Sequence, residues 1–264
     1  MQTGRSVREC PSTGKHVDRL NNPVSLVCCS LTPPAPDLDV RLGELDVDAH
    51  CVEQFAQLLS RDERERATRF HFARDRRRYT VARAMLRMLL AEKTGLSPAA
   101  VVFAQTQYGK PYMVDAPADL HFNVSHAAER AVFALASGSL PGIDIEHLQR
   151  NIDHDAIAAH YFAPREYADL QRISAAHRKH AFLAAWTCKE AIAKAIGQGL
   201  SLPLQQIEIA VCADAGQRLL NVPCGHLSDW SIYSANAGAD YVATVAVYRG
   251  PESGIAPAPA VNIS

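Results

Sequence analysis

Residues 142–146, GIDIE, alternate apolar and acidic side chains, and this pattern constrains the fold more than any other short segment of the chain. In an extended strand, successive side chains point to opposite faces, so Asp144 and Glu146 share one face. Ile143 and Ile145 then point to the other face. The segment is therefore predicted to be a strand with one face in the core and two carboxylates on the opposite face.

A helix is predicted in the region that contains WTCKEAIAKAIG, residues 186–197. Its apolar side chains recur at helical spacing: Phe182, Leu183, Trp186, Ala193 and Ile196. Glu190 and Lys194 are four residues apart, so they share one face of this helix. Taken alone, the strand pair could be a solvated edge and the helix pair a surface ion pair. Together, three carboxylates and a lysine indicate a site for a hard divalent cation and a phosphate.

The rest of the chain predicts an α+β fold with a turn near residues 138–141 at its midpoint. The predicted strands are residues 24–31, 99–103, 121–124, 131–136, 142–145, 207–211, 230–234 and 241–248. The predicted helices are residues 47–59, with Asp46 or Asp48 as cap, 62–93, with a break near 71–73, 153–160, 164–173 and 177–196. Each half then runs strand, helices, strands.

Four regions follow from this pattern. Residues 1–22 are polar and basic and are predicted to be a flexible extension. Residues 23–138 and 139–249 are predicted to form two α+β halves. Residues 250–264, rich in Pro, Ala and Gly, are predicted to be a flexible tail. The 48% hydrophobic content suffices for a sizeable core, and no stretch has the roughly 18 apolar residues of a membrane helix.

Charge and cysteine usage narrow the class of protein. The net charge of −1 gives no whole-molecule field that would select nucleic acid or a membrane. The seven cysteines include no CxxC pair, and an odd number argues against a complete disulfide framework. We therefore expect a reduced, cytoplasmic compartment.

Residues 61–78 form a basic segment with eight arginines and four acids. The segment could be a solvated helix with ion pairs four residues apart. It could also bind anions, because the planar guanidinium of arginine suits phosphate. RNA binding is less favoured, because the segment lacks interleaved aromatic residues for base stacking beyond Phe70, Phe72 and Tyr79.

Several motifs in one order resemble the 4′-phosphopantetheinyl transferases of the larger, surfactin-synthetase-activating (Sfp) type. The signature of that family is G-[IT]-D-I-E, then about forty residues, then W-[ST]-x-K-E-[AS]-x-x-K, and here GIDIE precedes WTCKEAIAK. Further similar segments, within roughly residues 40–250, are YGKP at 108–111, FNVSH at 122–126, YFAPREYADL at 161–170 and GQGLSLPL at 197–204.

The resemblance implies two similar α+β halves related by a pseudo-twofold axis, with the active site at their interface. It implies coenzyme A as substrate and Mg²⁺ as cofactor, with Mn²⁺ as an alternative, held by Asp144, Glu146 and Glu190. It implies that Glu190 and Lys194 are catalytic. It implies coenzyme A contacts by these residues: Arg66, Arg78, Gly109, Lys110, Pro111, Ser125, His126, Lys189 and Lys194. Glu63 falls where other members have a basic residue.

The implied reaction transfers 4′-phosphopantetheine from coenzyme A to a serine of an apo acyl, peptidyl or aryl carrier protein, giving holo carrier protein and adenosine 3′,5′-bisphosphate. Lys194 would stabilise charge on the leaving phosphate, and Lys189 would help to hold the pyrophosphate. Glu190 is the expected base, unless it is only a metal ligand and a water molecule takes the proton. The expected protein is a monomer with a small, acidic, helical carrier as partner.

Two other functions stay open on the residues alone. A metal-dependent nucleotide pyrophosphohydrolase could use the same carboxylates and lysine. A coenzyme A-binding protein without activity could keep the fold, although Asp144, Glu146, Glu190 and Lys194 are all present.

Overall fold

The computed structural model describes residues 28–31, 35–117, 119–199, 202–212 and 218–251. Two antiparallel sheets lie at its centre, with strand orders β1-β2-β6-β5 and β10-β11-β7. The first contains β1 (Cys28–Leu31), β2 (Leu38–Glu44), β5 (Leu120–Ala127) and β6 (Arg130–Ser137). The second contains β7 (Leu140–His147), β10 (Trp230–Ala235) and β11 (Tyr241–Tyr248). Two short hairpins add β3 (Phe103–Gln105) with β4 (Pro111–Met113) and β8 (Glu208–Ala210) with β9 (Arg218–Asn221).

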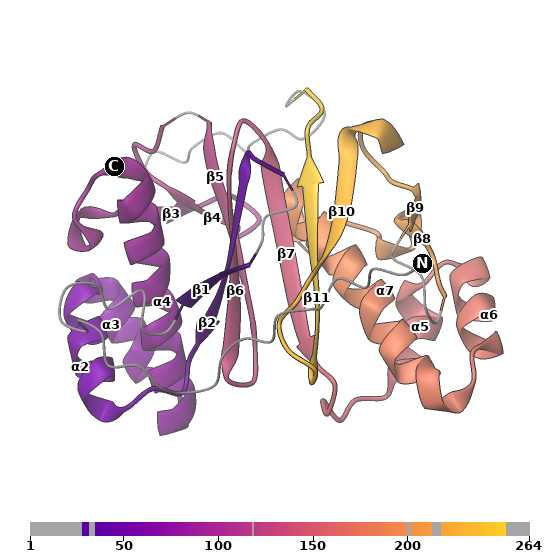
Figure 1. Ribbon diagram of the computed structural model, residues 1–264, viewed down its shortest axis with the longest axis horizontal. Coiled ribbons are helices and arrows are strands. Elements are labelled where there is room, and N and C mark those ends of the chain that lie inside the picture. The colour runs from indigo at the N-terminus through magenta and orange to yellow at the C-terminus, as the bar shows by residue number, and fades with distance from the viewer. Residues whose placement is uncertain (1–27, 32–34, 118, 200–201, 213–217, 252–264) are drawn as a thin grey trace, which may run out of the picture.

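Helices cover the outer faces of both sheets, so the layers run helices, sheet, sheet, helices (Figure 1). On the first sheet lie α2 (Ala49–Leu58), α3 (Arg61–Thr68) and α4 (Ala73–Thr94). On the second lie α5 (His154–Tyr161), α6 (Pro164–Arg172) and α7 (Ala175–Ile196). Short 3₁₀ turns are formed by Pro98–Ala100, Leu204–Gln206 and Leu227–Asp229.

Strand β6 shows why the centre of the molecule is apolar on both sides of a sheet. Its side chains alternate between two cores. Val132, Ala134 and Ala136 pack between the two sheets. Ala131, Phe133 and Leu135 pack against α2 and α4. A strand that is buried on both faces is expected to read as a continuous apolar run, as this one does.

The two halves of the chain follow one plan. The order β2-β6-β5 in the first sheet corresponds to β7-β11-β10 in the second. The long helices α4 and α7 each have 22 residues and each end at a glycine in the left-handed conformation, Gly95 and Gly197. This arrangement agrees with the predicted α+β fold of two similar halves. The domain limits remain predictions, and residues 1–27 and 252–264 lie outside the described residues.

Most predicted elements are present, and the errors concern strands. The helical region after residue 61 is interrupted as predicted, since α3 ends at Thr68 and α4 begins at Ala73. The strand predicted at residues 99–103 is instead β3, and residues 98–100 form a 3₁₀ turn. Strands β4 and β9 were not predicted, because each has only three or four residues and is defined by a hairpin partner. Strand β2 was also not predicted, although its seven residues, LDVRLGE, alternate apolar side chains with others. Of the strand predicted at 24–31, residues 24–27 lie outside the described residues.

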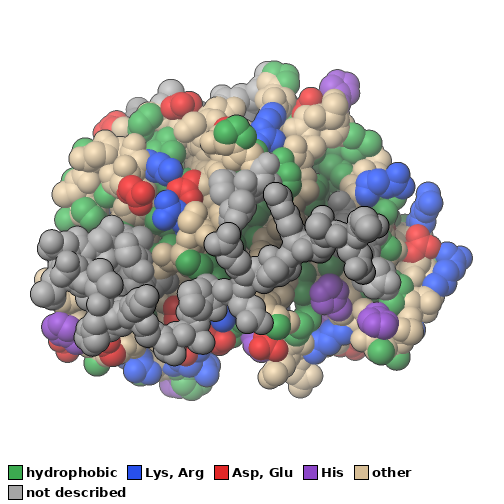
Figure 2. Space-filling view, viewed as in Figure 1, with side chains coloured by type: hydrophobic (Ala, Val, Ile, Leu, Met, Phe, Trp, Pro, Cys, Tyr) green, Lys and Arg blue, Asp and Glu red, His purple; other side chains and the backbone are tan. Residues whose placement is uncertain are grey.

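The face seen in Figure 2 shows no single dominant charge among the described residues. On the face seen in Figure 2, basic and acidic side chains of the described residues are interspersed, as a net charge of −1 leads one to expect. In the part of the chain that the structure describes, no helix combines the length and hydropathy needed to span a bilayer.

The start of α3 supplies a stability test. Ser60 Oγ accepts a hydrogen bond from the Glu63 amide at 3.3 Å, and Glu63 Oε2 accepts one from the Ser60 amide at 2.8 Å. We expect Ser60→Ala to lower the free energy of unfolding by about 1 kcal/mol. Urea denaturation would measure this, with the exposed Ser228→Ala as control, expected within about 0.5 kcal/mol of the parent. Equal midpoints for both variants would contradict the cap.

Candidate active site

Strand β7 carries its carboxylates on one face, as the sequence predicts. Ile143 and Ile145 lie in the core between the two sheets. Asp144 and Glu146 are both buried and point the other way, towards α7. Gly142 allows this closeness, because a Cβ atom there would lie 1.9 Å from Ala191 O and 2.5 Å from Ala195 N. The glycine therefore lets the strand backbone touch the helix backbone.

Asp144 is the centre of a polar group built from three elements. Its Oδ1 accepts hydrogen bonds from Ser125 Oγ of β5 at 2.8 Å and from Lys194 Nζ of α7 at 2.6 Å. Lys194 Nζ also donates to Ser125 Oγ at 2.9 Å. Asp144 Oδ2 is buried and has no hydrogen-bond partner among the described residues. Since β5 belongs to the first sheet and β7 to the second, the group lies where the two halves meet.

Glu146 and Glu190 add two carboxylates, and the pKa of each is raised. Burial and the negative charge of Asp144 raise the pKa of Glu146. Burial and Asp144 likewise raise the pKa of Glu190. Glu146 Oε1 forms an ion pair with Arg150 Nη1. Close like charges disfavour ionisation, and a bound cation would relieve that repulsion.

The donor chemistry of this group fits a hard divalent cation. Asp144 offers a buried oxygen without a partner, and all three candidate ligands are carboxylates. However, within the described residues no three His, Cys, Asp or Glu side chains converge closely enough to form a metal site in the present arrangement. In this arrangement Lys194 pairs with Asp144 Oδ1, and Arg150 pairs with Glu146 Oε1.

The tip of the β3–β4 hairpin reaches the same region. Gly109 has a φ of 81°, and its amide donates to Thr106 O at 2.9 Å in a tight turn. Lys110 Nζ donates to Ala195 O at 2.9 Å, near the C-terminus of α7, and Pro111 starts β4. The predicted segment 109–111 therefore lies beside the helix that carries Lys194.

The two predicted arginines lie on the helices of the first half. Arg66 is exposed, and its guanidinium lies 5.6 Å from the centre of the Tyr79 ring. Arg78 forms a two-pronged ion pair with Asp46, at 2.7 and 2.6 Å. Partial burial and the positive charges of Lys194 and Arg78 lower the pKa of His126, although its ring stays partly exposed. His126 therefore lies within reach of charges from both halves.

Lys189 and Glu63 are both buried and take part in ion pairs. Lys189 is fully buried, and Nζ contacts Glu166 Oε2 at 2.7 Å, Leu204 O at 2.9 Å and Ile207 O. Its donors are thus used inside the protein in this arrangement, and the expected contact with pyrophosphate stays a prediction. Glu63 is also buried, in an ion pair with Arg87, so it is a structural acid rather than an altered ligand at the surface.

Sequence reasoning missed two residues of this region. Arg150 follows Glu146 by four residues, but residues 148–150 lie outside any predicted element, so no helical spacing pointed to the ion pair. Glu166 is buried at the third position of α6, and that position was the available signal, since acids there cap helices.

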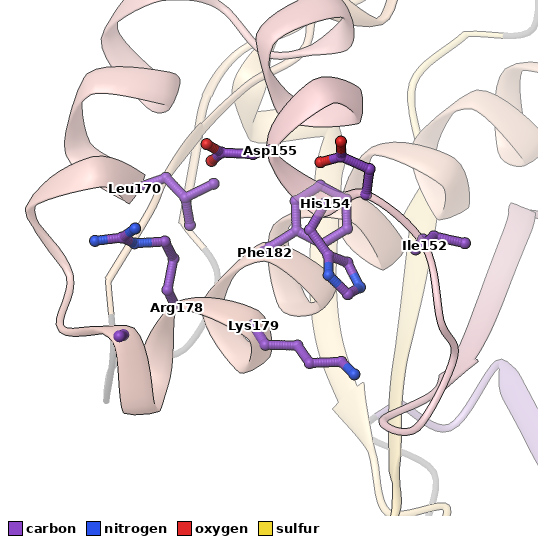
Figure 3. A pocket seen from close by; sticks show the side chains of 9 residues that line it. Ile152, His154, Asp155, Leu170, Arg178, Lys179 and Phe182 are labelled. Atoms are coloured by element: carbon purple, nitrogen blue, oxygen red, sulfur yellow. The ribbon is translucent and has the colours of Figure 1, made fainter.

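A separate pocket of about 350 Å³ lies between α5, α6 and α7 (Figure 3). His154 lies over Phe182, with ring centres 4.8 Å apart, and Lys179 and Arg178 line the same pocket. Its lining includes none of the predicted site residues. The pocket is therefore distinct from the carboxylate group at the junction of the halves.

Carboxylates that can hold a cation, with a lysine and further basic groups nearby, are typical of enzymes that transfer a phosphate-containing group. Comparison with known proteins gives the particular family. Residues 141–246 match the model of the 4′-phosphopantetheinyl transferase superfamily. Residues 48–138 match the model of the 4′-phosphopantetheinyl transferase N-terminal region.

Individual relatives agree with these matches. The 4′-phosphopantetheinyl transferase HetI of a Nostoc species is 36% identical over 77% of this chain and 84% of its own length. The 4′-phosphopantetheinyl transferase Sfp of Bacillus subtilis is 32% identical over 66% of this chain and 75% of its own length. A solved structure, the holo-[acyl-carrier-protein] synthase of Thermotoga maritima, covers 42% of this chain and 63% of that chain at 16% identity, with a TM-score of 0.34.

The chain belongs to the 4′-phosphopantetheinyl transferase superfamily. It is an enzyme that transfers phosphopantetheine from coenzyme A to carrier proteins. The matches do not favour the pyrophosphohydrolase or the inactive coenzyme A-binding protein.

Proposed function

We propose that this enzyme uses the carboxylate group at the junction of its two halves to transfer 4′-phosphopantetheine in a Mg²⁺-dependent reaction. The observation that carries the proposal is that Ser125 of β5 and Lys194 of α7 both donate to one oxygen of the buried Asp144 of β7, so three elements meet at this carboxylate. Glu146 and Glu190 belong to the same group, because Asp144 contributes to the raised pKa of each.

Asp144, Glu146 and Glu190 would hold the cation, with Mn²⁺ as a substitute for Mg²⁺. When bound, the cation neutralises pyrophosphate charge that would otherwise repel the incoming oxygen. Arg150 would leave Glu146 to free its carboxylate, which is plausible for a side chain that is 48% exposed. Lys194 would stabilise the charge that develops on the leaving phosphate.

Coenzyme A would lie between the hairpin tip and the helices of the first half. Gly109, Lys110 and Pro111 would contact the adenosine end, and Ser125, His126, Arg66 and Arg78 the phosphates. Arg78 is held by Asp46, whose carboxylate is 51% exposed, so a phosphate would have to share or replace that partner. Lys189 is left out of this set because it is buried.

The reaction forms one phosphorus–oxygen bond and breaks another. The serine oxygen of the carrier attacks the phosphorus that bears pantetheine. The bond from that phosphorus to the bridging oxygen breaks, and its electron pair leaves with adenosine 3′,5′-bisphosphate. Glu190 would take the serine proton as general base. If it only holds the cation, which would lower the pKa of its carboxylate, a water molecule would take the proton instead.

The partner would be a small, acidic, helical apo carrier protein of the acyl, peptidyl or aryl type. We expect a monomer, because one chain supplies every residue proposed for the site. Coenzyme A and apo carrier proteins are cytoplasmic substrates, so the reaction is proposed to run in the cytoplasm.

The test is intact-protein mass spectrometry of an apo acyl carrier protein incubated with the enzyme, coenzyme A and Mg²⁺. The expected result is a mass gain of one phosphopantetheine group. EDTA should abolish the gain. Glu190→Gln should lower the rate by about 10²–10⁴-fold, since a positioned base contributes that much.

Glu53→Gln, an exposed glutamate of α2, is the matched control and should keep the parent rate. Coenzyme A breakdown without a carrier mass gain would instead support a hydrolase. Coenzyme A binding with no modification of several apo carriers would overturn the proposed function.

A further inference from the structure

We propose that the buried pair Lys189–Glu166 is a positioning device that holds the helix of Glu190 and Lys194 in register with Asp144. This inference rests on the proposed function, because it concerns the same site. It gives Lys189 a role without contact to coenzyme A, and it gives Glu166 a role that its sequence position does not reveal.

Lys189 connects α7 to the segment that follows it. Its ammonium donates to Leu204 O at 2.9 Å and to Ile207 O, both in the stretch that leads from α7 to β8. Its third contact is Glu166 Oε2 at 2.7 Å, and both side chains are shielded from solvent. Burial lowers the pKa of Lys189, while Glu166 opposes that shift. All three donors are therefore committed to fixed protein oxygens.

Glu166 connects the same lysine to two further elements. Its Oε2 also accepts a hydrogen bond from the Ala163 amide at 2.7 Å, at the start of α6. Its Oε1 accepts one from the Ile209 amide of β8 at 2.7 Å. One buried ion pair thus joins α6, α7 and β8. A displaced Lys189 would break contacts on all of these elements together.

The first half contains the same device without catalytic residues beside it. Arg87 lies as far before Gly95 on α4 as Lys189 lies before Gly197 on α7. Its Nε contacts Glu63 Oε2 at 2.7 Å, and Glu63, like Glu166, is the third residue of the preceding short helix. Arg87 Nη1 donates to Pro98 O and Val101 O, both at 2.8 Å, in the segment after α4. The pairing is therefore a property of the repeated plan.

The second copy differs because of what its helix carries. Glu190 is the next residue after Lys189, and Lys194 lies slightly more than one turn further along. Across α7, the β7 backbone touches Ala191 and Ala195 at Gly142. The helix is thus held by β7 on one side and by the Glu166 pair through Lys189. Rotation or sliding of α7 would change the distance between Lys194 and Asp144, now 2.6 Å.

The test compares Lys189→Met with Arg87→Met in the full chain, using steady-state transfer to an apo acyl carrier protein. Lys189→Met leaves the buried Glu166 without its cation and should lower Tm by roughly 10 °C. Arg87→Met leaves Glu63 paired with Arg83 alone, at 2.5 Å, so it should lower Tm by a smaller amount. Assays are run well below either Tm. We expect Lys189→Met to lower kcat by about 10–100-fold with KM for coenzyme A within about twofold of the parent. Arg87→Met should keep kcat within about threefold.

Glu166→Gln and Glu63→Gln repeat the comparison from the acidic side, in case the methionine variants do not fold. Glu166→Gln should lower kcat, Glu63→Gln should not, and Lys189→Arg should restore part of the loss. A raised KM for coenzyme A with unchanged kcat in Lys189→Met would overturn the positioning role and favour ligand contact. Equal kcat losses in the variants of both halves would show that the Lys189–Glu166 pair contributes only to overall stability and would overturn the positioning role. If the parent enzyme itself gives no holo carrier, the proposed function fails first.

Discussion

Gly142→Ala is expected to destabilise the protein by at least about 3 kcal/mol and to abolish most of its transferase activity. The added Cβ would lie 1.9 Å from Ala191 O and 2.5 Å from Ala195 N. Both are backbone atoms of α7, so no flexible side chain can move aside. The strand and the helix must separate, and Lys194 is then drawn away from Asp144. Urea denaturation and the carrier mass assay would measure the two effects.

Gly43→Ala is the matched control for this prediction. Gly43 is a glycine of β2 that faces α4 in the first half, and a Cβ there would meet Met85 Sδ at 2.6 Å. Sulfur at the end of a flexible side chain can move more cheaply than a helix backbone. We therefore expect a smaller loss of stability and little change in activity. Parent-like stability for Gly142→Ala would show that β7 and α7 are not in backbone contact.

Asp144→Asn is expected to lower the transfer rate by about 10²–10³-fold while Tm changes by no more than about 3 °C. The substitution keeps the shape of the side chain, so Ser125 Oγ keeps an oxygen acceptor. It removes the charge that pairs with Lys194 and that would hold a cation. The substitution also removes the repulsion by which Asp144 raises the pKa of Glu146 and Glu190, so the lost ion pair with Lys194 is offset and the net penalty for folding is small. Intact-protein mass spectrometry and thermal denaturation would give the two values.

Asp39→Asn controls for the loss of a strand carboxylate as such. Asp39 lies on β2 and pairs with Arg41 at 2.6 Å and with Lys93 at 2.8 Å. We expect this variant to lose stability and to keep its transfer rate within about threefold. An active Asp144→Asn enzyme, or equal rate losses in both variants, would rule out a special role for Asp144.

The sequence predicted the parts of the site that local pattern determines. Alternation in GIDIE placed Asp144 and Glu146 opposite Ile143 and Ile145, and burial in the structure confirms this division. Helical spacing placed Glu190 and Lys194 on one helix, α7. Both predictions depend on backbone periodicity, which a short segment already contains.

Contacts that depend on a distant partner were not predicted. Lys189 belongs to the apolar series of α7, which was a signal of burial, but its partner Glu166 is in another helix. Lys110 was expected at the adenosine, yet its amine also contacts Ala195 O across the junction of the halves. Such contacts arise only when separate elements pack, so no local pattern encodes them.

The shared plan of the two halves has a consequence for stoichiometry. Register matches Asp144 of β7 with Arg41 of β2, since each lies three residues before the end of its strand. Lys194 of α7 likewise matches Glu92 of α4, and Arg41 and Glu92 lie 3.5 Å apart. The first half therefore has an ion pair at the same place, but its strand carries the positive charge and its helix the negative one. Because an arginine cannot bind a cation, the first half lacks the ligand that Asp144 supplies in the second. A chain built from two similar halves should accordingly take up one equivalent of divalent cation and modify one carrier at a time.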